Sequence, residues 1–307
     1  MWRWRTTRLS IGLVSFLVIG CLQRQSVATQ ICREHCSSRQ TEAERSHKTD
    51  ESYCVTTSAL QTAPKTYTQL CYTPVESAVN SQNVKPFFQK HLNKTGVLLC
   101  TGPTLNEYVH QVFDENHQRV VTVGVNGIIF SDTVQTHGLD YLFIQDTGRK
   151  SQARSENAFY KKVDAYTSFR SRAQTFYGLF RTNHIGPTDE ERRTANALYY
   201  EAEYPACPQL IPLVKDVGRY TFGGSCSVAM AALQFILYSG VSKVKLVGCD
   251  VTSSYSWEES VAPAYNEQLL EMWRIVPEFV AHHYPDVRIE VVRPVGLKDI
   301  DFNKKVL

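Results

Sequence analysis

The stretch that decides the fold is VLLCTGPT, residues 97–104, in which a short apolar run enters a glycine-proline turn. Such a run bounded by turn residues is typical of a buried strand. Thr104 and Glu107 then have the spacing of a capping box, so we expect a helix that begins after Thr104, with Thr104 as its N-cap. A strand that passes through a tight turn into a helix is the opening unit of an α/β fold.

The same pattern recurs along the chain. Compact apolar runs predict buried strands at 120–125, 141–144, 243–247 and 288–292. An apolar helix is expected at 228–238, after Gly223-Gly224-Ser225, and a final helix at 265–284 with a kink at Pro277. Strands that alternate with helices through short loops predict a Rossmann-like, doubly wound, mostly parallel sheet over residues 91–307.

Residues 148–217 interrupt this pattern, because they are polar and basic with interspersed Tyr and Phe. An insertion of this length in an α/β enzyme often covers the site or binds the acceptor. We therefore expect a helical lid or acceptor region here, with an ordinary solvated helical cap as the alternative.

The amino terminus predicts targeting to the secretory pathway. Arg3, Arg5 and Arg8 precede an apolar run of 14 residues from Leu9 to Leu22. A membrane span needs about 20 residues, so residues 1–28 are interpreted as a signal peptide or a short signal-anchor. Residues 29–90 are polar and are expected to form a stem. This organisation predicts a Golgi or ER membrane protein with a lumenal domain, or a secreted protein.

Nine cysteines and a glycosylation sequon fit that compartment. Cys32, Cys36, Cys54 and Cys71 lie in polar sequence, where disulfides of undetermined pairing are expected. Cysteines in apolar runs, namely Cys100, Cys226 and Cys249, are expected to be buried. The sequon is Asn93-Lys94-Thr95. The net charge of +3 and the scattered basic residues argue against nucleic acid as a partner.

Small and polar residues follow the predicted strands, where ligands bind in open parallel sheets. Each such turn alone has a simpler explanation as a turn or helix cap. Together with Gly224 and Ser225, which precede the expected helix at 228–238, they predict a nucleotide site formed by Gly102, Pro103, Thr104, Asn126, Asp146, Gly224, Ser225 and Asp250.

Five motifs in this order resemble a known group. They are LCTGPTL at 99–105, GVNG at 124–127, DYLFIQD at 140–146, GGSCSVAMAAL at 223–233 and KVKLVGCD at 243–250. The chain is similar over about 97–292 to the bacterial lipooligosaccharide sialyltransferases, glycosyltransferase family 42. It also resembles related nucleotide-binding proteins, including the archaeal 6-hydroxymethylpterin pyrophosphokinases.

The sialyltransferase resemblance implies a CMP-activated acidic sugar as donor, bound without a metal. It implies that the Gly102-Pro103-Thr104 turn contacts phosphate or ribose and that Asn126 binds the nucleotide. Gly224 and Ser225 would then line the cytidine pocket, with Asp250 on the ribose side. Asp146 stands where the family has an Asn, and Tyr255 stands where tyrosine hydroxyls steady the leaving phosphate.

The family's general base is a His after that tyrosine region, and this chain has none between Asp250 and Tyr265. His184, Glu258 or Glu259 is expected to serve instead. The leading expectation is a sialyltransferase-like glycosyltransferase that acts on a glycan acceptor. The alternatives are a pyrophosphokinase-like enzyme that uses ATP and Mg²⁺, or an inactive nucleotide or glycan binder.

Overall fold

The computed structural model describes residues 74–114, 120–145, 173–180, 197–203, 212–224, 227–251 and 266–304. Residues Pro74–Leu307 form one compact unit. The expected targeting segment and residues 29–73 of the expected stem lie outside the described residues. Residues 74–90, which we expected to belong to the stem, hold helix α2 (Ala78–Asn83) and a 3-10 helix at Lys85–Phe87. The Asn80 side chain accepts a hydrogen bond from the Glu201 N–H at 2.7 Å, so this segment is tied to the sheet.

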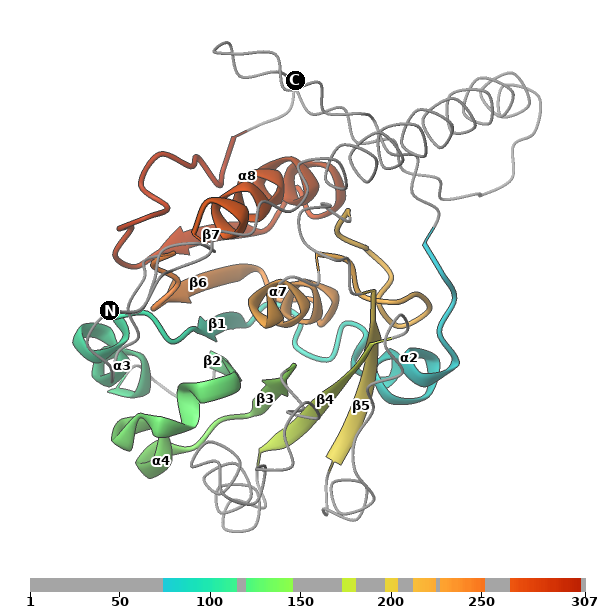
Figure 1. Ribbon diagram of the computed structural model, residues 1–307, viewed down its shortest axis with the longest axis horizontal. Coiled ribbons are helices and arrows are strands. Elements are labelled where there is room, and N and C mark those ends of the chain that lie inside the picture. Colours follow the sequence, from blue (N-terminus) through green and yellow to red (C-terminus); the bar gives the residue numbers. More distant parts are fainter. Residues whose placement is uncertain are drawn as a thin grey trace, which may run out of the picture. The chain divides into compact units, whose positions relative to one another are not determined.

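Seven strands form one sheet in which every neighbouring pair is parallel, in the order β5-β4-β3-β2-β1-β6-β7 (Figure 1). The strands are β1 (Thr95–Leu99), β2 (Val120–Val125), β3 (Tyr141–Ile144), β4 (Gln174–Phe180), β5 (Ala197–Ala202), β6 (Lys243–Val247) and β7 (Arg288–Val291). The doubly wound parallel sheet predicted from the sequence is confirmed. The expected strands at 120–125, 141–144 and 243–247 have the predicted bounds.

The order of the strands reverses at β1. From β1 the chain proceeds outward through β2, β3, β4 and β5, and β6 then returns to the other side of β1. Neighbouring loops diverge at such a reversal and leave a crevice beyond the carboxyl ends of the strands. The topology therefore predicts a crevice beyond β1 and β6.

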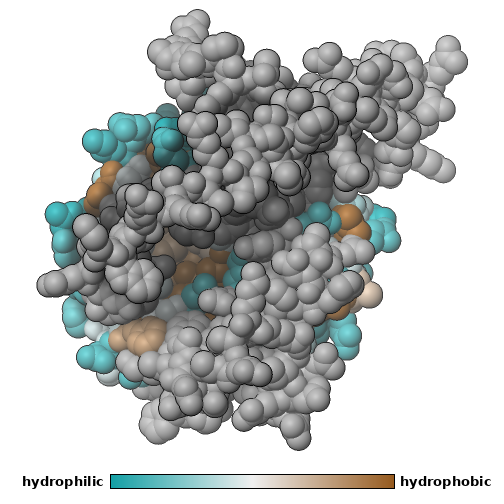
Figure 2. Space-filling model, viewed as in Figure 1, coloured by the Kyte–Doolittle hydropathy of each residue, from teal (hydrophilic) through white to brown (hydrophobic). Residues whose placement is uncertain are grey.

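Alternating side chains bury both faces of the sheet. On one face, Val97 and Leu99 pack in a cluster with residues from α3 (Leu105–Asp114) and α4 (Asp132–His137). On the other face, Phe143 stacks on Phe176 with ring centroids 4.7 Å apart, and both contact Phe235 of α7 (Val228–Tyr238). Every residue of α7 is buried, which explains why its sequence is apolar all round. In the view of Figure 2, hydrophilic residues of the described part lie along its rim, and a few lie beside hydrophobic residues near the centre.

The range 148–217 contributes strands where we expected a helical lid. Within it, β4 pairs with β3 and β5 pairs with β4, and Phe143 lies opposite Phe176. These segments form strands because their apolar and aromatic side chains bury more surface in the sheet than they would in a solvated helical cap. The residues of this range that join the strands lie outside the described residues, so a lid or acceptor role for them stays a prediction.

The carboxyl-terminal elements complete the other edge of the sheet. Helix α8 (Asn266–His283) continues through Pro277 and is followed by β7. The Asn303 amide accepts a hydrogen bond from the Ile289 N–H at 3.1 Å and donates one to the Ile289 carbonyl at 2.9 Å, which covers the open edge of β7. No helix in the described ranges has the length and apolarity needed to cross a membrane.

Candidate functional site

A hydrogen-bonded brace joins the loops that leave β1 and β6. The Asp250 carboxylate accepts a hydrogen bond from the Thr104 N–H at 2.7 Å and another from the Thr104 hydroxyl at 2.5 Å. Both residues are buried, with Asp250 3% and Thr104 6% exposed. Hydrogen bonds to a charged acceptor are the strong ones, so this brace fixes the two loops against each other at the point where the strand order reverses.

The turn after β1 fits only without a side chain at Gly102. The Gly102 N–H donates to the Gly248 carbonyl at 2.8 Å. A Cβ at Gly102 would lie 2.5 Å from that carbonyl oxygen and 2.6 Å from Asp250 Oδ2. Gly102 and Pro103 are partly exposed beside the buried brace, so the backbone of this turn is partly accessible.

The predicted capping box at Thr104 is wrong. The Thr104 N–H donates to the carboxylate of Asp250, which follows β6. This carboxylate takes the place that a capping box gives to the side chain of Glu107. Glu107 instead pairs with Arg293, which follows β7, and both side chains are about half exposed. The start of α3 is therefore held by residues from the two strands on the other side of the reversal.

Asn126 links the ends of β2 and β3. Its side chain accepts a hydrogen bond from the Gln145 N–H at 2.9 Å, and its backbone has the left-handed φ of 40° that Asn tolerates better than most residues. Asn126 is partly exposed and also begins a 3-10 helix at Asn126–Phe130. The residue predicted to bind the nucleotide thus occupies a defined position at the carboxyl edge of the sheet.

Gly224 is required by packing. It has a φ of 64°, and a Cβ there would lie 2.7 Å from Leu213 Cδ2. The preceding Gly223 is anchored through its N–H and carbonyl to the buried Gln234 side chain, at 3.3 and 2.9 Å. The cap of α7 is Ser227, whose hydroxyl accepts from the Ala229 N–H at 3.3 Å. The glycine pair therefore precedes the helix by several residues, and a contact from it to phosphate stays a prediction.

Val251 is a feature that sequence reasoning missed. It follows Asp250 directly and has a φ of 53°, which is an outlier for a β-branched residue. The Asp250 carbonyl accepts a hydrogen bond from the Gly296 N–H at 2.9 Å, and a Cβ at Gly296 would lie 2.2 Å from that oxygen. Asp250, at the exit from β6, is thus held by Thr104 through its side chain and by the backbone of Gly296 through its carbonyl. Sequence patterns carry no signal for this strain, because Val at this place reads as an ordinary strand residue.

The remaining predicted site residues are Asp146, His184, Ser225, Tyr255, Glu258 and Glu259, and all of them lie outside the described residues. The described part therefore brings together Gly102, Pro103, Thr104 and Asp250, with Asn126 at the end of β2, the strand next to β1. In the described ranges, no three His, Cys, Asp or Glu side chains are grouped as metal ligands would be. The arrangement offers backbone groups and polar side chains for binding, and the predicted proton-transfer groups lie outside the described residues.

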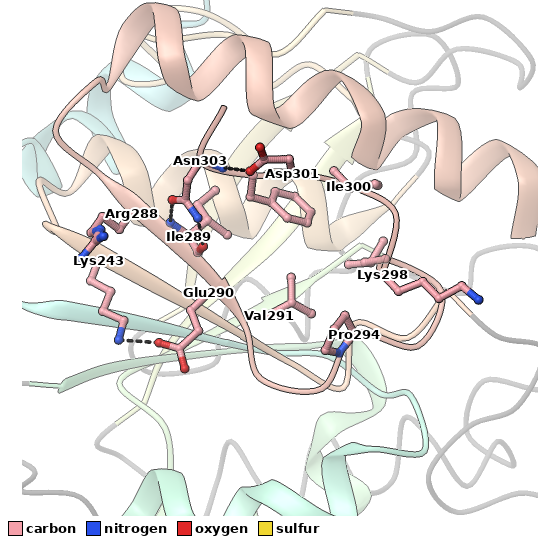
Figure 3. Close-up of a pocket in the computed structure, with 12 residues that line it drawn as sticks. Lys243, Arg288, Ile289, Glu290, Val291, Pro294, Lys298, Ile300, Asp301 and Asn303 are labelled. Carbon is pink, nitrogen blue, oxygen red and sulfur yellow. Dashed lines mark hydrogen bonds and ion pairs between the residues drawn. The ribbon is translucent and has the colours of Figure 1, made fainter. Parts of the chain in front are cut away.

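A separate cavity of about 420 Å³ lies along the edge strand β7 (Figure 3). Its wall contains Lys243 and Arg288, the first residues of β6 and β7, and Lys243 forms an ion pair with Glu290. It contains none of the predicted nucleotide-site residues. We therefore do not assign the site to this cavity.

No protein-family model and no curated protein matches the chain. Among solved structures, the chain is similar to the MAf glycosyltransferase from Magnetospirillum magneticum AMB-1, with a TM-score of 0.42 and 14% sequence identity. The match covers 71% of this chain and 36% of that one, so this chain spans about a third of that protein's length. A likeness this loose identifies neither a substrate nor a reaction.

Proposed function

We propose that the protein is a nucleotide-sugar-dependent glycosyltransferase whose donor is a CMP-activated acidic sugar such as CMP-sialic acid. The observation that carries the proposal is the brace between Thr104 and Asp250, which holds the carboxyl ends of β1 and β6 at the reversal of strand order. A crevice at this point of an open parallel sheet is where such folds bind nucleotides.

In this proposal, the donor's phosphate and ribose lie against the backbone of the Gly102-Pro103 turn. That turn can approach a ligand closely because it has no side chain at Gly102. Asn126 contributes its amide group from the end of β2. Asp250 acts chiefly by positioning, since both of its carboxylate oxygens already accept hydrogen bonds from Thr104.

The chemistry is assigned to residues outside the described part. A base, His184, Glu258 or Glu259, takes the proton of an acceptor hydroxyl, whose oxygen attacks the anomeric carbon of the donor. The bond to the phosphate breaks, and Tyr255 donates a hydrogen bond to the phosphate oxygen that gains charge. The glycan acceptor, and a tether of the domain to a secretory membrane by residues 1–28, belong to the same proposal.

A ligand panel tests this function. The melting temperature of the full chain is measured with CMP, UDP, GDP and ATP, each with and without Mg²⁺. We expect CMP to raise it without a metal, because a ligand that binds only the folded state stabilises that state. Stabilisation by ATP that depends on Mg²⁺ would contradict the proposal and favour a pyrophosphokinase-like enzyme.

Hydrolysis or transfer of the donor sugar separates an enzyme from a binder. We expect CMP release from CMP-sialic acid to fall at least about tenfold in Tyr255→Phe, because one donor to the leaving phosphate is lost. CMP binding without any CMP release by the unaltered protein would indicate an inactive nucleotide binder.

A further inference from the structure

Two thiols meet at the base of the candidate site. Cys100 follows β1 and Cys249 follows β6, and their Sγ atoms lie 2.6 Å apart although the residues are 149 positions apart in sequence. Both are free cysteines and both are buried, 7% and 6% exposed. Their burial was predicted from the sequence, and their contact was not.

The backbone turn at Gly248 allows the side chains of Cys100 and Cys249 to meet. The register pairs Leu99 with Val247, so Cys100 is opposite Gly248. In continuous extended backbone, successive side chains point to opposite faces, and Cys249 would face away from Cys100. Gly248 has a φ of 67°, which turns the chain and brings the Cys249 side chain to the Cys100 side. A Cβ at Gly248 would lie 2.5 Å from the Cys100 carbonyl oxygen, so the turn requires glycine.

The spacing of the sulfur atoms also suits a covalent link. From 2.6 Å, the two Sγ atoms need to approach by only about 0.6 Å to reach the S–S length of about 2.0 Å in a disulfide. Among the described residues these are the only two cysteines, so neither has a competing thiol partner there.

We propose that Cys100 and Cys249 are a site of disulfide formation that covalently joins the exits of β1 and β6. With hydrogen peroxide as the two-electron oxidant, one thiolate attacks the peroxide, which gives a sulfenic acid and hydroxide. The second thiol then attacks the sulfenic sulfur and expels its oxygen as water. The two thiols lose two protons and two electrons in total, and one peroxide becomes two molecules of water.

The bond would act directly on the loops of the candidate site. Cys100 precedes Gly102 by two residues, and Cys249 immediately precedes Asp250. Oxidation would therefore add a covalent link beside the hydrogen-bonded brace. Burial raises the pKa of the Cys249 thiol, because the thiolate would lose its hydration, so the reaction is expected to accelerate as the pH rises.

Peptide mapping of the full chain tests the proposal. The protein is reduced, exposed to hydrogen peroxide, blocked with N-ethylmaleimide and digested with trypsin. Cleavage after Lys94, Arg119, Lys245 and Arg274 releases peptides 95–119 and 246–274, each of which contains a single cysteine. We expect these two peptides joined, two hydrogens lighter than their sum, and separated again by dithiothreitol.

The melting temperature shows whether the bond belongs to the folded protein. A link that closes so long a loop is expected to raise it by on the order of 10 °C in the oxidised protein. Cys100→Ser is the matched control, and its melting temperature should not respond to peroxide in this way. Both peptides blocked by N-ethylmaleimide after oxidation, either cysteine joined to a different one, or a joined pair without a rise in melting temperature would each overturn the proposal. No ligand is used, so the outcome is independent of the proposed function.

Discussion

The brace between Thr104 and Asp250 yields the sharpest stability prediction. Its hydrogen bonds measure 2.7 and 2.5 Å, and both residues are buried. A hydrogen bond to a charged group contributes about 1.5–3 kcal/mol. Thr104→Val removes one bond, so we expect its unfolding free energy to fall by about that amount. Asp250→Ala removes both bonds and leaves two buried donors, which we expect to cost about 3–5 kcal/mol.

A double-mutant cycle measured by urea denaturation separates this interaction from other effects of the substitutions. We expect Thr104→Val and Asp250→Ala to be non-additive, with a coupling energy of about 1.5–3 kcal/mol. The chain offers a comparable pair between β2 and the residue before β3. Asp140 also accepts from the N–H and hydroxyl of a threonine, Thr122, at 2.8 and 3.1 Å, but Asp140 is exposed.

Solvent competes for an exposed carboxylate, so Thr122→Val with Asp140→Ala should show a coupling of about 1 kcal/mol or less. The contrast between the two cycles isolates the effect of burial. Equal coupling in both pairs, or additive effects at Thr104 and Asp250, would refute the view that a buried brace holds the two strand exits together.

Three further perturbations test separate features. Asn126→Gly should cost about 1 kcal/mol through the lost bond to Gln145, and Asn126→Ala about 1–2 kcal/mol more because of the left-handed backbone; urea denaturation measures both. Burial lowers the pKa of His283 from its usual 6.5 to about 4, so the unfolded state binds more protons in that window. The melting temperature should therefore fall as the pH falls from 6.5 to 4, and less so in His283→Gln. The buried Tyr200 hydroxyl has no hydrogen-bond partner in the described structure, so Tyr200→Phe should leave the unfolding free energy unchanged or raise it by up to about 1 kcal/mol, again measured with urea.

The sequence predicted the elements whose own residues determine them. Helix 228–238 and the strands at 120–125, 141–144 and 243–247 are compact apolar segments between turn residues, and the structure has each at the predicted bounds. Strands β4 and β5 were missed although their segments, QTFYGLF and ALYYEA, are rich in aromatic residues. The basic and polar sequence around them masked this signal, because we judged residues 148–217 by their average composition.

The sequence predicted which of the candidate residues follow the ends of strands, and it did not predict the contacts between them. Turn residues after each strand indicated where the site would be, since parallel strands end at a common edge. The partner of Thr104 could not be inferred, because Asp250 lies 146 residues away and the nearer Glu107 satisfied the same local pattern. Sequence patterns indicate hydrogen-bond partners that are near in sequence, whereas the fold can bring a residue that is distant in sequence close to Thr104.

Strain at Val251 provides a last test of whether this edge of the sheet is adapted to a ligand. A left-handed conformation costs a β-branched residue about 1–3 kcal/mol, and glycine loses about 0.5–1 kcal/mol in chain entropy, so Val251→Gly should raise the unfolding free energy by about 1 kcal/mol. If the strain sets the position of Asp250 for binding, the same variant should show a smaller rise in melting temperature with CMP. Gln89, with a φ of 52°, lies before β1 at the opposite edge and is the matched control. Gln89→Gly should also gain stability and should leave the effect of CMP unchanged. A Val251→Gly protein that gains stability and keeps its full response to CMP would show that the strain has no part in binding.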